Sequence, residues 1–378
     1  MSLIKSKGFN NINQMVVFVL APSIESEDEQ IEYYYDFTQS INEYTQVFRD
    51  LNLTWYWKPV NMNTFTTVID EIVDRYQTQN ILPVVLNLCD GDEINGTPGI
   101  SVVNRLAEKK LIYTGADAFF YNITTSKIPM KRAFDEYGVA SPNWRIILSA
   151  STNYEELFLA LGRPIIVKPA VSAGSMGVGV KNVVESAVQL SSIVEDLTQG
   201  YRGWNLTTDG IIAESFIKGP EFTTLIVGSY DDPQNAMVFA PVERVFHSSL
   251  PEKEKFLSFE RLWEIYENET PMPGGEHFYE YAPPPQSLVD EIKKVSWDAF
   301  ASNKGKGYTR VDLRIDAESK KIYVLEVNAQ CGLSDDENYT SIGAILKYAK
   351  FSFTDLIALI LKDAIRRHDN QKEYVSFD

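Results

Sequence analysis

Two neighbouring segments near the carboxyl end of the chain constrain its fold most. Tyr308 to Asp316 and Lys321 to Ala329 each alternate apolar with polar side chains, as half-buried strands do, and a short polar turn joins them. The pattern predicts an antiparallel hairpin with one face in the core. That face fixes the register, because a slip of one residue would turn every apolar side chain outward. The predicted register pairs Val311 with Val327, Leu313 with Leu325 and Ile315 with Tyr323.

The opposite face of this hairpin predicts a metal site. In the same register Asp312 lies beside Glu326, and Arg310 lies beside Asn328. Two carboxylates that face each other across a sheet repel, so such a pair usually has a cation or a shared proton between them. With the Asn328 oxygen they form an all-oxygen ligand set, which suits Mg²⁺ bound together with a substrate phosphate. The alternative is a solvated sheet face with ordinary charges.

Length, composition and charge limit the classes of protein. The 378 residues exceed one typical core, and the 44% hydrophobic content is that of a folded protein. A formal net charge of −17 argues against nucleic acid or an anionic membrane as the main partner. The two cysteines, Cys89 and Cys331, lie far apart without metal-type spacing, so we expect reduced thiols in a cytoplasmic protein. The apolar run Met15 to Ala21 is too short for a membrane span and predicts a core strand.

Alternating strand and helix patterns predict a parallel α/β domain over residues 1–123. Its expected strands and helices are 15–20, 29–50, 65–76, 81–88, 102–109 and 112–114. Ligands of such sheets bind beyond the carboxyl ends of the strands, where Ala21 to Ser23 and Cys89 to Asp92 would lie.

Two further units of α+β type are expected, over residues 124–222 and 223–378. Their predicted elements are 126–137, 144–148, 154–161, 164–168, 211–217, 221–227, the hairpin and a terminal helix at 353–367. The charged and aromatic stretch 242–285 predicts a lid or binding loop, with disorder as the alternative.

A glycine-rich turn is the candidate phosphate site. Strand 164–168 runs directly into residues 170–179, whose small side chains let backbone N–H groups approach phosphate oxygens, and Ser172 and Ser175 add hydroxyl donors. The turn lacks the ending of a Walker A loop and the glycine order of a dinucleotide fingerprint. Lys168 ends a buried strand and favours an anionic partner, because an unpaired buried lysine is costly.

Two glutamates around a Gly-Pro turn predict a nucleoside site. Glu214 interrupts an apolar run, and Glu221 opens the next strand. As a pair they suit the amino group and the ribose hydroxyls of a nucleoside, whereas side chains that point to solvent are the alternative.

Together these residues resemble the ATP-grasp superfamily, and most closely the D-alanine–D-alanine ligases. The resemblance covers the chain from about Thr124 onward and is looser over the first domain, where Tyr113-Thr-Gly is similar to the family's connection into the ATP-binding part. It rests on Lys127, Lys168, Glu214-Ser-Phe-Ile, Glu221, Arg310-Val-Asp312 and Glu326-Val-Asn328 with Gly332. It implies an ATP-grasp fold behind the N-terminal domain, with residues 124–222 as the central ATP-binding subdomain and 223–378 as the catalytic subdomain.

The resemblance also implies roles for these residues. The groups expected to hold the ATP phosphates are Lys127, Lys168, Ser172, Gly174 and Ser175. Those expected to contact the nucleoside are Glu214, Phe216 and Ile217 at the adenine and Glu221 at the ribose. The ligands expected for two Mg²⁺ ions, with Mn²⁺ as an alternative, are Asp312, Glu326 and Asn328. The expected catalytic groups are Arg310, Ser175 and the backbone N–H of Gly332.

The implied activity is an ATP-dependent carboxylate–amine ligase. A carboxylate attacks the γ-phosphate to give an acyl phosphate, and an amine then displaces phosphate to form an amide, with positioning and charge neutralisation as the main contributions of the protein. The expected partners are an amino acid or another small carboxylate and an amine, and the family also implies a homodimer. Two alternatives are an ATP-grasp kinase that stops at phosphorylation and a nucleotide-binding regulatory protein without turnover.

Several loops depart from the family pattern. Ser172-Ala-Gly-Ser175 stands where the family usually has Glu followed by Gly-Ser-Ser, and Lys253 or Lys255 stands in the lid in place of a Tyr-Lys pair, with a solvated charge as the alternative. The family's acceptor Ser position falls on Glu337 within the acidic run 334–338, unless an insertion brings Ser341 there. Because acids repel a free carboxylate, we hypothesise that the amine acceptor is not D-alanine and is neutral or cationic. Glu25 or Glu27 is the candidate for the glutamate that faces the first substrate.

Overall fold

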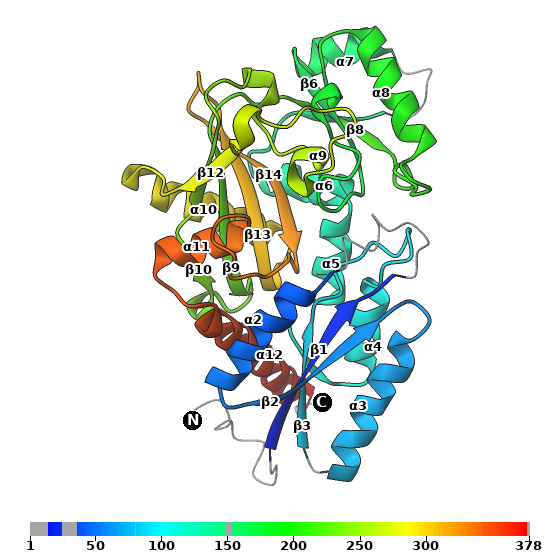
Figure 1. Ribbon diagram of the computed structural model, residues 1–378, viewed down its shortest axis with the longest axis vertical. Coiled ribbons are helices and arrows are strands. Elements are labelled where there is room, and N and C mark those ends of the chain that lie inside the picture. Colours follow the sequence, from blue (N-terminus) through cyan, green and yellow to red (C-terminus); the bar gives the residue numbers. More distant parts are fainter. Residues whose placement is uncertain (1–13, 25–35, 80, 148–152, 376–378) are drawn as a thin grey trace.

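The computed structural model describes residues 14–24, 36–79, 81–147 and 153–375, and three sheets form its framework (Figure 1). The N-terminal sheet has the order β2-β1-β3-β4, and its adjacent strands are parallel. Its strands are β1 (Gln14–Pro22), β2 (Thr54–Val60), β3 (Ile81–Asn87) and β4 (Ile112–Tyr113). Every residue of β1 except Gln14 is buried, because helices cover both faces of the sheet.

Helices α2 (Thr38–Asp50) and α12 (Phe353–Val375) pack on one face of this sheet, and α3 (Phe65–Gln79) and α4 (Ile100–Glu108) pack on the other. The expected parallel α/β domain is therefore present. Strand β2 was not predicted from the sequence. Helix α2 begins at Thr38 rather than near residue 29, and residues 25–35 lie outside the described ranges.

The central sheet is antiparallel with the order β5-β8-β6-β7. Its strands are β5 (Trp144–Ile147), β6 (Ile165–Pro169), β7 (Val183–Val184) and β8 (Ile211–Ser215). Helices α7 (Tyr154–Leu161) and α8 (Ala187–Gln199) cover one face, and α6 (Lys127–Tyr137) packs against the other. After the glycine-rich turn, residues 180–182 form a 3₁₀ turn that leads directly into β7.

The C-terminal sheet has the order β12-β11-β9-β13-β14, with β10 beside β9. Its strands are β9 (Glu221–Ser229), β10 (Met237–Val238), β11 (Val242–Phe246), β12 (Tyr279–Ala282), β13 (Lys306–Ile315) and β14 (Ile322–Ala329). The helices that pack on it are α5 (Ala118–Thr125), α10 (Gln286–Ser302) and α11 (Ser341–Ala349), whereas α9 (Phe259–Trp263) packs in the apolar cluster of the central sheet. The stretch 242–285 is thus more regular than predicted, since it contains β11, α9 and β12.

The hairpin register is partly as predicted. Arg310 pairs with Asn328 and Asp312 with Glu326. A bulge after Asp312 then pairs Leu313 with Val324 rather than Leu325. The two predicted pairs beyond the bulge, Leu313 with Leu325 and Ile315 with Tyr323, are therefore wrong.

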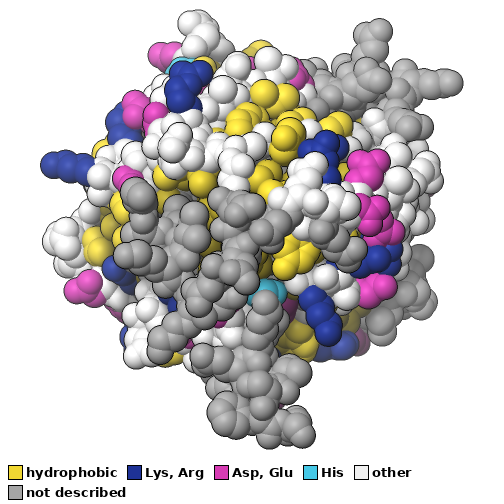
Figure 2. Space-filling model, turned by 90° about the horizontal axis from the view of Figure 1, so that it is seen from below, with side chains coloured by type: hydrophobic (Ala, Val, Ile, Leu, Met, Phe, Trp, Pro, Cys, Tyr) yellow, Lys and Arg dark blue, Asp and Glu magenta, His cyan; other side chains and the backbone are white. Residues whose placement is uncertain are grey.

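The outer sheets share their cores. One apolar cluster joins β1 and β3 to α12 and to β9, and a second joins α4 and α5 to β13 and β14. The domain boundaries at residues 123 and 222 stay a prediction. No helix within the described ranges is long and apolar enough to cross a membrane. On the face seen in Figure 2, Lys and Arg side chains lie among Asp and Glu, without a broad basic patch over the described side chains.

Candidate active site

The half-buried polar face of the β13–β14 hairpin brings the predicted metal ligands together. Asp312 lies opposite Glu326 on β14 and opposite Thr223 on β9. The Asp312 carboxylate accepts hydrogen bonds from Arg310 Nη2 at 2.8 Å, Thr223 Oγ1 at 2.7 Å and Asn328 Nδ2 at 3.0 Å. Although burial alone would raise the pKa of Asp312, the Arg310 charge and these hydrogen bonds hold it below its usual range.

The donor set fits a hard divalent cation. Asp312, Glu326 and Asn328 offer carboxylate and amide oxygens from adjacent strands, which is the chemistry that Mg²⁺ prefers. No group of three or more His, Cys, Asp or Glu side chains gathers as a metal site in the described part of the chain. The third ligand from the protein would therefore be the amide oxygen of Asn328, whose nitrogen now faces Asp312.

Helix α6 carries two buried lysines, Lys127 and Lys131. The Ser126 hydroxyl caps its first turn, and Gly138 with a φ of +70° ends it. Lys127 and Lys131 are four residues apart, so they lie on one face of the helix. Lys127 Nζ lies 3.2 Å from Ser172 Oγ and 3.6 Å from Glu326 Oε2. The spacing from Lys127 is the sequence signal that could have found Lys131, which was missed.

Lys131 and Lys168 both pair with Glu214. Lys131 Nζ lies 2.8 Å from Glu214 Oε1, and Lys168 Nζ lies 2.9 Å from Oε2. Burial alone would raise the pKa of Glu214, but the two lysine charges lower it to about 2. Burial also lowers the pKa of Lys131, against the opposing effect of Glu214.

An apolar cluster lies beside this ion-paired group. Phe216 meets the ring of Phe256 edge to face, with 6.1 Å between centroids. The other members of the cluster are Ile166, Val178 and Val183. Such a surface suits a purine ring. Ile217 follows Phe216, and its carbonyl accepts a hydrogen bond from Arg314.

Glu221 lies farther along the C-terminal sheet and is buried. One of its oxygens pairs with Arg244 and the other accepts from Arg314 Nη2 at 2.8 Å. Sequence reasoning missed both arginines, because their meeting with Glu221 depends on the order of β11, β9 and β13. The predicted contact of Glu221 with a ribose would have to share this carboxylate with two guanidinium groups.

The glycine-rich turn is held by the segment 252–269. Gly174 has a φ of +54° and its carbonyl accepts from Trp263 Nε1 at 3.0 Å. The Ser175 hydroxyl donates to the Leu257 carbonyl at 3.1 Å, and Glu269 accepts from the Val180 N–H at 2.9 Å. The predicted lid is therefore a folded segment docked on the turn. Of the two candidate lid lysines, Lys253 is exposed and Lys255 pairs with Glu252.

The loop after β14 uses its acidic residues in different ways. Gly332 is exposed, with open space around the position of a Cβ atom. Asp336 accepts from the backbone N–H groups of Asn338 and Tyr339, and Glu337 pairs with Lys347 at 2.8 Å. Asp335 is an exposed residue, but partial desolvation of its carboxylate, together with the charges of Glu337 and Asp336, raises its pKa. Glu25 and Glu27 lie outside the described residues.

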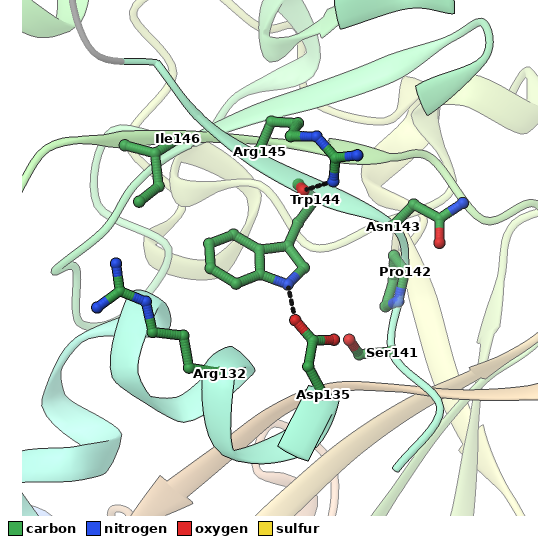
Figure 3. Close-up of a pocket in the computed structure, with 8 residues that line it drawn as sticks. All are labelled: Arg132, Asp135, Ser141, Pro142, Asn143, Trp144, Arg145 and Ile146. Carbon is green, nitrogen blue, oxygen red and sulfur yellow. Dashed lines mark hydrogen bonds between the residues drawn. The ribbon is translucent and has the colours of Figure 1, made fainter. Parts of the chain in front are cut away.

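A separate cavity of about 390 Å³ opens between α6 and the edge strand β5 (Figure 3). Trp144 lies across it, and the indole Nε1 donates to Asp135 Oδ2 at 3.1 Å. Arg132 on α6 and Arg145 on β5 flank the indole ring. None of the predicted site residues lines this cavity.

Residues 134–362 match the family model for the C-terminal part of D-Ala-D-Ala ligases. The chain belongs to the D-alanine–D-alanine ligase family. Its sequence is 25% identical to the D-alanine–D-alanine ligase of Borrelia garinii over 58% of this chain and 53% of that protein. It is 25% identical to the Marinobacter nauticus ligase over 69% of each chain. The match to the Borrelia enzyme thus spans about half of that protein.

Solved structures of the D-alanine–D-alanine ligase family share the fold. The ligase of Bacillus anthracis complexed with ATP has a TM-score of 0.64 at 19% identity and covers 94% of this chain and 99% of its own. The Coxiella burnetii ligase has a TM-score of 0.66 at 14% identity, and the match covers 96% of this chain and 98% of that ligase. The predicted ATP-grasp fold and the family resemblance are therefore confirmed, whereas the roles of individual residues stay predictions.

Proposed function

We propose that this family member is an ATP-dependent ligase that joins a small carboxylate, such as an amino acid, to an amine. One observation supports the proposal most. Lys127 lies between Ser172 of the glycine-rich turn and Glu326 of the hairpin, at 3.2 and 3.6 Å. This proximity supports the proposal that the phosphate site and the metal site are parts of one site, as transfer of a phosphoryl group requires.

Each part of this site has a proposed task. Asp312, Glu326 and Asn328 would hold Mg²⁺, which supplies charge neutralisation at the phosphates. Lys127 and Lys168 bind the phosphates. The remaining proposed contacts are Ser172, Gly174 and Ser175 at the phosphates, Phe216 and Ile217 at the adenine, Glu221 at the ribose, and Arg310 and the Gly332 N–H at the reacting carboxyl group. Glu214, which the resemblance places at the adenine, is buried with both carboxylate oxygens paired with lysines, so its proposed part is that of their counterion.

Two bonds form and two break in the proposed reaction. A carboxylate oxygen of the first substrate bonds to the γ-phosphorus while the bond to the β-phosphate oxygen breaks and ADP leaves. The amine nitrogen then bonds to the acyl carbon while the bond from that carbon to the phosphate oxygen breaks; inorganic phosphate leaves, and the nitrogen releases a proton to solvent. Arg310 suits the second step, because a fixed guanidinium stabilises the negative charge that develops on the acyl oxygen.

The acceptor amine is proposed to be neutral or cationic and to lack a free carboxylate. Lys347 already neutralises Glu337, so the uncompensated charges of the loop are those of Asp335 and Asp336. In the described part of the chain Asp335 forms no ion pair. Each close contact of such an acid with a substrate carboxylate costs about 1 kcal/mol or more in a partly dry site.

Release of ADP with D-alanine and with D-alaninamide as acceptors tests this proposal, because the two differ only in the carboxylate. We expect at least about fivefold higher kcat/KM for the amide, and a smaller difference in an Asp335→Asn variant. Equal or better turnover of D-alanine would refute the proposal about the acceptor, but the proposed ligase activity would still stand. Mass detection of products separates the alternatives, since ADP without an amide indicates a kinase and ATP binding without ADP indicates a regulatory protein.

A further inference from the structure

The group formed by Lys131, Glu214 and Lys168 carries an excess positive charge inside the protein. One carboxylate faces two ammonium groups at 2.8 and 2.9 Å. The side chains of Lys131 and Glu214 are 0% and 1% exposed, so no ligand can touch Lys131 directly. A largely buried cation without a counterion is unfavourable, so the positive charge left over in the group favours an anion from outside it.

Lys168 is the member of the group that can meet such an anion. Its side chain is 14% exposed, and it ends β6 where the glycine-rich turn begins. Glu326, another acid of the predicted site, already pairs with Lys127 at 3.6 Å. A ligand anion at the mouth of β6 would therefore complete the charge balance, and Lys168 is the group that it would contact.

We propose that Lys131 is a positioning residue of the nucleotide site, which neutralises Glu214 and thereby leaves the charge of Lys168 for a nucleotide phosphate. This inference rests on the proposed nucleotide site. Without Lys131, Glu214 would keep Lys168 as its sole counterion, and the phosphates would compete with a buried carboxylate for it. With Lys131 present, each carboxylate oxygen of Glu214 has its own ammonium partner, at 2.8 and 2.9 Å, which fixes the orientation of this buried side chain.

Binding of Mg-ATP and of adenosine, measured by calorimetry, tests the proposal without turnover. We expect Lys131→Met to weaken Mg-ATP binding at least about tenfold, because its Lys168 is held by Glu214, and to change adenosine binding less than about threefold. The double variant Lys131→Met/Glu214→Gln removes both charges, so Lys168 is released and the Mg-ATP affinity returns to within about threefold of the wild type.

Arg132→Met is the matched control. It removes a positive charge from the next residue of α6, whose side chain points into the outer cavity (Figure 3), and we expect no change in either affinity. An equal loss for ATP and adenosine in Lys131→Met would indicate structural damage and overturn the proposal. So would a Lys131→Met variant that binds Mg-ATP like the wild type.

If Lys131→Met does not fold, the double variant tests the proposal instead. It is expected to fold because it leaves no unpaired charge from the Lys131–Glu214 pair in the core. Mg-ATP binding more than about tenfold weaker than in the wild type would then contradict the proposal. A wild-type protein that binds no Mg-ATP would instead refute the proposed function, so the two failures are distinguishable.

Discussion

Glu214 shows how a single carboxylate can be charged in the core of this protein. Glu214 is 1% exposed, and carboxyl groups that are buried to this extent are usually neutral unless they are paired. Two lysines outweigh the cost of burial and hold its pKa at about 2 rather than the ordinary 4.5. The sequence identified Glu214 as unusual because it interrupts an apolar run. Its second lysine partner, Lys131, comes from a different element and was not predicted.

The lowered pKa of Glu214 predicts a pH dependence of stability. The folded protein holds this proton more weakly than the unfolded chain, so the stabilisation is complete above about pH 5 and is lost as the pH falls toward 2. We expect Glu214→Gln to lower the free energy of unfolding by on the order of 3 kcal/mol at pH 7, and by less at pH 4. Urea unfolding at several pH values measures this.

Glu195→Gln is the control for this prediction, since Glu195 is an exposed carboxylate on α8. We expect its effect to stay within about 0.5 kcal/mol at every pH. If Glu214→Gln lowered the free energy of unfolding by the same amount at pH 7 and at pH 4, the charge of Glu214 would not be the cause of the loss of stability.

At the scale of elements, the alternation of apolar and polar residues predicted the strands that position the site. Prediction from local sequence failed for elements whose conformation depends on packing against distant parts of the chain. The Asp312–Glu326 and Arg310–Asn328 pairs lie on the side of the bulge that alternation describes correctly. The adjacent apolar residues Val324 and Leu325 break the alternation, and this doublet was the available signal for the bulge. Val324 takes the fully buried position.

Other elements were beyond local prediction. Strand β2 and helices α5, α8, α10 and α11 were not predicted from their sequences. The segment 252–269 is ordered by non-local bonds to the glycine-rich turn, such as those of Trp263 and Glu269. These bonds join residues about ninety positions apart, so a local pattern cannot reveal them, and the stretch resembled a long loop.

The docking of this segment predicts that Gly174 has a special role in the turn. A Cβ atom there would lie 2.9 Å from Trp263 Cζ2, in addition to the strain of its positive φ. We expect Gly174→Ala to displace Trp263 and to weaken Mg-ATP binding by about tenfold, because the turn is then no longer held in place. Calorimetric titration measures the affinity.

Gly203→Ala is the control for the backbone strain alone. Gly203 has a φ of +81° but open space around its Cβ position, so we expect lower stability with unchanged nucleotide affinity. If both alanine variants bound Mg-ATP equally well, the contact with Trp263 would not be what holds the turn.

At the scale of the whole molecule, α12 joins the two ends of the chain. It packs beside α2 and the N-terminal sheet, and its apolar residues share one cluster with β9 of the C-terminal sheet (Figure 1). The chain thus runs from the N-terminal sheet through the central sheet to the C-terminal sheet, and α12 then packs back against the N-terminal sheet. The proposed nucleotide and metal groups come from α6, β6, β8, β9, β13 and β14, so their relative positions depend on this shared core.

The shared core predicts that the N-terminal and C-terminal sheets unfold together. Leu361 is 0% exposed within the α12 cluster, and Leu361→Ala should cost about 2–5 kcal/mol. In hydrogen-exchange measurements on this variant, peptides from β1 and from β13 should lose the same free energy of protection, because neither sheet keeps its core without α12. Leu159→Ala, at a side chain 87% exposed on α7, should change protection by less than about 0.5 kcal/mol. Loss of protection in β1 alone would show that the two sheets are independent units, and the predicted boundary at residue 123 would then be a boundary of folding as well as of sequence.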